Sequence, residues 1–156
     1  MIELVIPGRG NFYLEHLVLD LNGTIALDGR VIEGVGERLQ NLGRTLNIYL
    51  VTADTLGNAE KTGNILKIKL HKIGKDNEDV KKLDLIQQLG AGKTVCIGNG
   101  LNDVLMLKNS TIGICVVGGE GAAFEAVAAS DLVVNNINDA LDLLLNPSRI
   151  IATLRK

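Results

Sequence analysis

Short, mostly apolar runs recur along this chain, and they constrain its fold more than any other feature of the sequence. They cover residues 17–19, 48–51, 94–97, 112–116 and 132–134. Strands with continuous rather than alternating apolarity are typical of parallel sheets that are covered on both faces. The runs therefore predict an α/β fold in three layers, with a doubly wound, mostly parallel sheet in the middle.

Helical patterns fill the intervals between these runs. The clearest pattern covers 76–89, where apolar residues recur at three-residue spacing from Val80 and Gly90 stands at the position of a C-terminal cap. Further helices are expected over 33–42, 56–66, 120–129, 140–145 and 150–154. Strands that alternate with helices favour right-handed crossovers between parallel neighbours.

Two segments predict smaller elements. The first dozen residues are expected to add an edge strand to the sheet, with a turn at 7–10. Residues 25–32, with Asp28-Gly29 as their turn, predict a small flap. Because no repeat or linker-like stretch interrupts the pattern, residues 1–156 are expected to form one domain.

Composition and charge exclude several classes of function. A net charge of -2 and a pI of about 5.7 give no basic surface, so we expect no nucleic-acid partner. We also expect no membrane partner and a cytoplasmic location, because the sequence shows neither a signal peptide nor a run of about 18 apolar residues. Cys96 and Cys115 each lie in an apolar run, which favours buried free thiols.

Polar residues follow the predicted strands at the carboxyl edge of the sheet, where reactive groups collect in open parallel sheets. Asp20 directly follows the first run, and Gly23 and Thr24 come shortly after it. Thr52 directly follows the second run, and the turn 98–103, rich in Gly and Asn, follows the third. A carboxylate, a hydroxyl and a glycine-rich turn at one edge indicate a site for a phosphoryl group.

Phosphoryl transfer requires a nucleophile, groups that neutralise the phosphoryl oxygens, and a bridging metal ion. We interpret Asp20 as the nucleophile, and Thr52 with a lysine of the third helix as the neutralising groups. Asp20 and Asp103 then supply carboxylates for Mg²⁺. The lysine is Lys82 by helical register, with Lys81 as the alternative.

Three motifs carry a resemblance to a known family. Asp20-Leu21-Asn22-Gly23-Thr24 resembles Asp-Lys-Thr-Gly-Thr of the P-type ATPases, Thr52-Ala53-Asp54 resembles their Thr-Gly-Asp, and residues 98–103 resemble their Gly-Asp-Gly-x-Asn-Asp. The chain therefore resembles the haloacid dehalogenase (HAD) superfamily. Within that superfamily it is most similar to the small soluble P-type ATPase-like proteins.

The resemblance implies a HAD-like Rossmannoid fold and a phosphatase or phosphotransferase that forms an aspartyl-phosphate on Asp20. It also implies that Mg²⁺ is held by Asp20, the backbone carbonyl of Asn22, Asn99 and Asp103. The residues expected to surround the bound phosphoryl group and metal are Gly23, Thr24, Ala53, Gly98 and Gly100.

Two amides depart from the usual pattern of the superfamily. Asn22 replaces the aspartate that acts as general acid and base, and an amide cannot exchange that proton. Asn99 replaces a metal-binding aspartate, which predicts weaker Mg²⁺ binding, although its side-chain oxygen can still coordinate. We therefore expect slow turnover. The alternative is a weakly active or inactive regulatory domain that only binds phosphate and Mg²⁺.

The spacing of the motifs leaves no room for an inserted cap domain. About thirty residues separate Asp20 from Thr52, and about thirty separate Thr52 from Lys82, enough for one helix and its turns. The chain therefore resembles the capless members of the superfamily, which suggests a phosphorylated substrate of unknown identity and a homo-oligomer. Residues 118–121 are expected to form a strand-to-helix turn near the site.

Residues 90–94 imitate the end of a nucleotide-binding P-loop. They follow a predicted helix and enter a predicted strand, the reverse of the order that a P-loop requires. We therefore expect no nucleotide site at Lys93.

Overall fold

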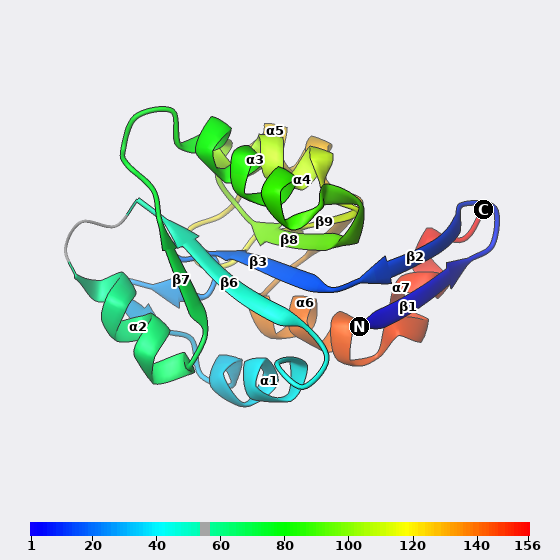
Figure 1. Cartoon of the computed structure of the whole chain (residues 1–156), viewed down its shortest axis with the longest axis horizontal. Helices are drawn as coiled ribbons and strands as arrows, with labels where there is room; N and C mark the ends of the chain where they lie inside the picture. Colours follow the sequence, from blue (N-terminus) through cyan, green and yellow to red (C-terminus); the bar gives the residue numbers. More distant parts are fainter. Residues whose placement is uncertain (54–56) are drawn as a thin grey trace.

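A six-stranded sheet forms the centre of the computed structural model, which describes residues 1–53 and 57–156. The strand order is β10-β9-β8-β3-β6-β7, and all neighbouring strands are parallel. The strands are β3 (His16–Asp20), β6 (Asn47–Thr52), β7 (Lys69–Lys72), β8 (Thr94–Gly98), β9 (Ile112–Val116) and β10 (Leu132–Val134). Helices flank both faces of the sheet, which confirms the predicted three-layer α/β fold (Figure 1).

Successive side chains of the central strand β3 enter different hydrophobic clusters. Val18 packs in the cluster that contains residues of α3 (Glu78–Leu89), α4 (Val104–Asn109) and α5 (Phe124–Ala129). Leu17 and Leu19 pack in the other cluster. That cluster includes residues of α1 (Val35–Leu42), α2 (Asn58–Leu66) and α6 (Ile137–Leu145). The apolar runs are continuous because both faces of each strand are buried.

The path of the chain places a crevice beside β3. The chain first builds outward from β3 through β6 to β7, and then crosses to β8 on the other side of β3 before continuing to β9 and β10. Strands β3 and β8 are therefore neighbours that leave the sheet toward helices on opposite faces. Ligand sites of open α/β sheets lie at such a switch point, at the carboxyl ends of the strands.

The amino-terminal segment differs from the prediction. Strands β1 (Ile2–Ile6) and β2 (Gly10–Leu14) form an antiparallel hairpin in a sheet of their own, so the predicted edge strand of the central sheet was wrong. The hairpin packs against α7 (Pro147–Leu154), away from the carboxyl end of β3, where Asp20 lies (Figure 1). Residues of β1 are alternately buried and exposed, which suits a strand with one covered face.

The predicted flap is confirmed as a hairpin. Strands β4 (Ala26–Leu27) and β5 (Arg30–Val31) pair in antiparallel fashion. Their turn has positive φ at Asp28 (50°) and Gly29 (75°), as a two-residue hairpin loop of type I′ requires. The hairpin follows the Asp20 turn directly in sequence. The two are also joined by a hydrogen bond, because Gly23 N–H donates to the carbonyl of Ala26 (2.8 Å).

Two details of the elements were not predicted. Strand β7 was missed because its sequence, Lys-Leu-His-Lys, is polar, as the edge position permits. In α3 the buried residues are Lys82, Leu85 and Ile86, and Leu83 and Leu89 pack against the same cluster. Of the residues at three-residue spacing, Val80 alone is exposed. The residues described contain no helix long and apolar enough to span a membrane.

Both cysteines are buried free thiols, as predicted. Burial raises the pKa of Cys96 to about 12, so this thiol stays protonated near neutral pH.

Candidate active site

The predicted residues meet at the carboxyl edge of the sheet, around a pocket of about 470 Å³. Asp20 is the last residue of β3, and Thr52 is the last residue of β6. Because parallel strands in register end at the same edge, their turns converge on one space. The pocket is lined by Asp20, Asn22, Thr52, Ala53, Lys75, Glu78, Asn99, Gly100, Asn102 and Glu120.

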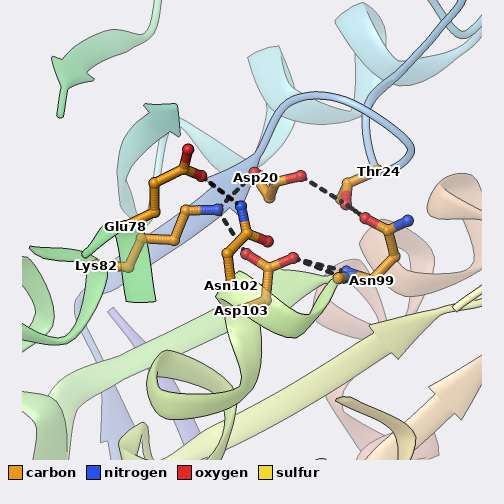
Figure 2. Close-up of polar contacts among 8 residues, drawn as sticks. Asp20, Thr24, Glu78, Lys82, Asn99, Asn102 and Asp103 are labelled. Carbon is orange, nitrogen blue, oxygen red and sulfur yellow. Dashed lines mark hydrogen bonds and ion pairs between the residues drawn. The ribbon is translucent and has the colours of Figure 1, made fainter. Parts of the chain in front are cut away.

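Lys82 lies between two carboxylates in the interior of the site. Its Nζ is 2.7 Å from Oδ1 of Asp20 and 2.6 Å from Oδ1 of Asp103 (Figure 2). Lys82 and Asp103 are completely buried, and Asp20 is 7% exposed. Lys81 instead lies beside Gly74 and lines a separate surface pocket. The structure thus brings Lys82, and not Lys81, to Asp20.

Asp103 organises the turn after β8 with its second oxygen. This Oδ2 accepts hydrogen bonds from the backbone N–H groups of Asn99 and Gly100, both at 2.9 Å. Gly98 permits the arrangement, because a Cβ at this position would lie 2.5 Å from Cγ of Asp103. The turn enters the short 3₁₀ helix η2 (Leu101–Asp103) and then α4. The glycines of the motif therefore allow the backbone to fold around a carboxylate.

Thr24 and Asn99 join the Asp20 turn to the β8 turn. The Thr24 hydroxyl lies 3.4 Å from Oδ2 of Asp20 and 3.2 Å from Oδ1 of Asn99 (Figure 2). The Asn99 amide nitrogen donates to the carbonyl of Gly121 (3.1 Å), in the loop after β9. Residues from three strand ends are thereby held together on one side of Asp20.

Gly23 allows two side chains to approach the Asp20 turn closely. Its φ is 77°, a value that favours glycine. A Cβ at this position would lie 2.5 Å from Nδ2 of Asn99 and 2.6 Å from Oε2 of Glu120. A side chain at position 23 would therefore displace both groups from the backbone.

The surroundings of Asp20 disfavour its negative charge. Burial and the nearby Asp103 raise the pKa of Asp20 to about 7, although Lys82 acts in the opposite direction. For Lys82, burial alone lowers the pKa, but attraction by Asp20 and Asp103 outweighs it and leaves the pKa above its usual value. A second cation beside Asp20 would relieve the excess negative charge.

The donor atoms of the site suit a small divalent cation. They are oxygens: the carboxylate of Asp20, the side-chain oxygen of Asn99 and the backbone carbonyl of Asn22, all on residues that line the pocket. The described part of the chain contains no group of three His, Cys, Asp or Glu residues arranged for a metal ion. Mg²⁺ is commonly bound through one or two carboxylates while it keeps several waters, so these residues fit Mg²⁺ better than zinc.

Sequence reasoning missed four residues that line the pocket. Asn102 belongs to the turn 98–103 and donates to Oε2 of Glu78 (2.7 Å), at the start of α3. Lys75 and Glu120 lie in loops. Of these four residues, only Asn102 lies in one of the three motifs. Glu120 could have been noticed in the sequence as a charged residue between glycines. Asp54, which completes one predicted motif, lies outside the described residues.

The P-loop-like segment follows α3 and enters β8, as predicted, and it lies away from the site. Ala91–Lys93 form the 3₁₀ helix η1 before β8, at the opposite end of that strand from Asn99. Lys93 forms an exposed ion pair with Glu15 (3.0 Å). Its ammonium group therefore does not reach the pocket.

Four known proteins match the sequence, two of which are described here, whereas no model of a known protein family matches it. The uncharacterized protein MJ0073 of Methanocaldococcus jannaschii is 47% identical over 94 residues, which are 58% of this chain and 99% of that protein. The chloroplastic copper-transporting ATPase PAA1 of Arabidopsis thaliana is 26% identical over 127 residues. That match covers 80% of this chain but only 13% of the ATPase.

Solved structures of HAD-family hydrolases have the same fold. The 3-deoxy-D-manno-octulosonate 8-phosphate phosphatase of Moraxella catarrhalis, in complex with magnesium, phosphate and KDO, superposes with a TM-score of 0.69 at 20% identity. The match covers 91% of this chain and 94% of the phosphatase. The chain therefore has the fold of the HAD-family hydrolases, and it belongs to the same family as the archaeal protein MJ0073.

Proposed function

We propose that this chain is an Mg²⁺-dependent phosphatase or phosphotransferase that forms an aspartyl-phosphate on Asp20. The observation that carries the proposal is the position of Lys82, whose ammonium group joins Asp20 to Asp103 at the edge of the sheet. A buried carboxylate next to a fixed cation, in an open polar pocket, suits the binding of a phosphoryl group. The phosphatase with the same fold, bound to magnesium and phosphate, supports this chemistry.

In the proposed reaction, a carboxylate oxygen of Asp20 attacks the phosphorus of a phosphomonoester. The P–O bond to the alcohol breaks, and the alcohol leaves with a proton from water. Lys82 and the Thr52 hydroxyl neutralise the phosphoryl oxygens, while Thr24 and Asn99 orient the Asp20 turn. Mg²⁺ held by Asp20, Asn22 and Asn99 would neutralise charge on the phosphoryl group. Water then hydrolyses the aspartyl-phosphate.

Proton transfer is the weak part of this site. Asn22 is exposed at the pocket and cannot serve as general acid or base. The absence of a positioned acid or base typically lowers the rate by about 10²–10⁴-fold. We therefore propose that turnover is slow and favours activated esters.

Similarity to the copper-transporting ATPase supports assignment to the P-type ATPase-like subgroup. The match spans most of this chain but a small part of the transporter, so the proposal concerns the phosphorylation chemistry and excludes transport. The substrate class is a small polar phosphomonoester, because the described residues that line the pocket include charged and amide side chains but no aromatic ring.

Hydrolysis of p-nitrophenyl phosphate with Mg²⁺ tests the proposal. We expect slow release of nitrophenol by the wild type and none by Asp20→Asn. Asp84→Asn, which changes an exposed aspartate on α3, is the matched control and should behave as the wild type. Equal activity of the wild type and Asp20→Asn would contradict the nucleophilic role of Asp20.

The second candidate is a regulatory domain that binds phosphate and Mg²⁺ without turnover, which the amides Asn22 and Asn99 favour. Beryllium fluoride, which mimics an acyl-phosphate, separates the two candidates. A higher Tm with beryllium fluoride and Mg²⁺, but no hydrolysis by the wild type or Asn22→Asp, would establish the regulatory function. Hydrolysis by either protein would establish the enzyme.

A further inference from the structure

We propose that Glu120 binds the divalent cation, directly or through one of its waters, and replaces the carboxylate that is missing at position 99. The inference rests on the proposed function, because it assumes a metal ion beside Asp20. It assigns a role to a residue outside the three motifs. Four observations support it: the shape of the loop, the pairing of Asn99, the position of the Glu120 carboxylate and the charge of the site.

The loop between β9 and α5 is shaped to lie against the Asp20 turn. Gly118 and Gly121, on either side of Glu120, have positive φ (56° and 76°). A Cβ on Gly118 would lie 3.2 Å from the carbonyl oxygen of Gly23. Small residues therefore bring this loop close to the backbone of the turn that carries Asp20.

Asn99 holds this loop in place through its amide group. Its Nδ2 donates to the carbonyl of Gly121 (3.1 Å), and its own backbone carbonyl accepts from Ala123 N–H (2.9 Å). An aspartate at position 99 would place a carboxylate oxygen against the Gly121 carbonyl instead of a donor. The amide at position 99 and the placement of Glu120 are therefore coupled.

The Glu120 carboxylate stands over the Asp20 turn, next to the Asn99 amide. Its Oε2 and the Asn99 Nδ2 occupy the space that a Cβ on Gly23 would fill, at 2.6 and 2.5 Å from that position. Glu120 lines the same pocket as Asp20 and Asn22. Within the part of the chain that the structure describes, this carboxylate forms no hydrogen bond or ion pair. It is therefore available to a ligand of the pocket.

The charges of the site leave room for one more carboxylate. Lys82 cancels one of the two negative charges of Asp20 and Asp103, and Asn99 is neutral. With both carboxylates ionised, Asp20, Asp103 and Lys82 together carry one net negative charge. Glu120 supplies the second negative charge, from the side of the pocket where Asn99 lies.

Isothermal titration of the substrate-free protein with Mg²⁺ tests this inference without any measurement of activity. Glu120→Gln should weaken Mg²⁺ binding by about 10- to 100-fold, as is typical when a residue supporting a metal site is removed. Glu125→Gln, an exposed glutamate in the first turn of α5, is the matched control and should change the affinity less than about twofold. Because Glu120 is exposed, we expect its variant to keep the wild-type Tm.

A second variant moves the carboxylate to the position where the superfamily has it. Asn99→Asp in the Glu120→Gln background should recover Mg²⁺ affinity to within about tenfold of the wild type. A double variant that binds Mg²⁺ no better than Glu120→Gln would contradict the replacement. Equal affinity of the wild type and Glu120→Gln would overturn this inference alone, since the Asp20 variants test the proposed function separately. A wild-type chain that binds no Mg²⁺ would contradict both.

Discussion

The two sides of the candidate active site differ in how completely their charged groups are paired. On the paired side, made by Asp20, Lys82 and Asp103, the ammonium group joins both carboxylates in the interior. On the open side, made by Asn22 and Glu120, the side chains are exposed at the pocket. The groups proposed to neutralise a phosphoryl group are thus part of the core, whereas those proposed to govern proton transfer and metal affinity lie at the surface.

This difference teaches which changes the fold can tolerate. A substitution on the paired side leaves a charge in the interior without its partner, so it affects stability and function together. A substitution on the open side leaves the core unchanged, so it affects function alone.

The largest effect is expected on the paired side, for Lys82→Met. Two buried carboxylates would lose their shared cation, and breaking a buried ion pair in this way typically costs about 3–5 kcal/mol. Urea unfolding measures the loss, and phosphatase activity should disappear. Lys81→Met, the next residue on α3, should stay within about 0.5 kcal/mol of the wild type. Similar losses of unfolding free energy in Lys82→Met and Lys81→Met would show that the ion pairs of the paired side do not stabilise the fold.

On the open side, Asn22→Asp should raise kcat without a change in stability. It introduces a general acid and base at the pocket, which is worth about 10²–10⁴-fold in rate. Steady-state kinetics with p-nitrophenyl phosphate and urea unfolding measure the two quantities. The exposed Asn41→Asp on α1 is the matched control and should leave kcat unchanged. An unchanged kcat in Asn22→Asp would show that proton transfer does not limit the rate.

A smaller effect is expected for Gly23→Ala, which lies between the two sides. Gly57 is the matched control, because it has a similar φ (80°) but none of the described residues lies within 4 Å of an added Cβ. Both alanine variants carry the strain of positive φ, but only Gly23→Ala crowds Asn99 and Glu120. Gly23→Ala should therefore lose about 1–3 kcal/mol more stability in urea unfolding. Equal losses would mean that the crowded groups move away freely.

The paired side was largely predictable from sequence. Asp20 and the turn 98–103 follow apolar runs directly, and the ends of parallel strands meet at one edge by the geometry of the sheet. The lysine needed the structure. Lys81 and Lys82 are adjacent; helical register favoured Lys82, but only the structure shows its ammonium group against Asp20 and Asp103.

The open side was less predictable because loops supply it. Glu120 reaches the pocket through a loop whose path depends on Asn99 and on the positive φ of its glycines, and neither is visible as periodicity. The amino-terminal hairpin was misplaced for a related reason. The structure shows that β1 has alternating burial, as a strand with one covered face has, but a strand pattern in the sequence does not say which sheet the strand joins.

The shared ammonium group of Lys82 also links the site to the integrity of the whole chain. Asp20 and Asp103 follow the central strands, whereas Lys82 comes from a helix that packs on one face of the sheet. A molecule that engages all three binds only when that helix is docked, and at 100 times its Kd it adds about 2.7 kcal/mol to the free energy of unfolding. Resistance of the chain to proteolysis would then increase with the concentration of that molecule, and so would the lifetime of the chain.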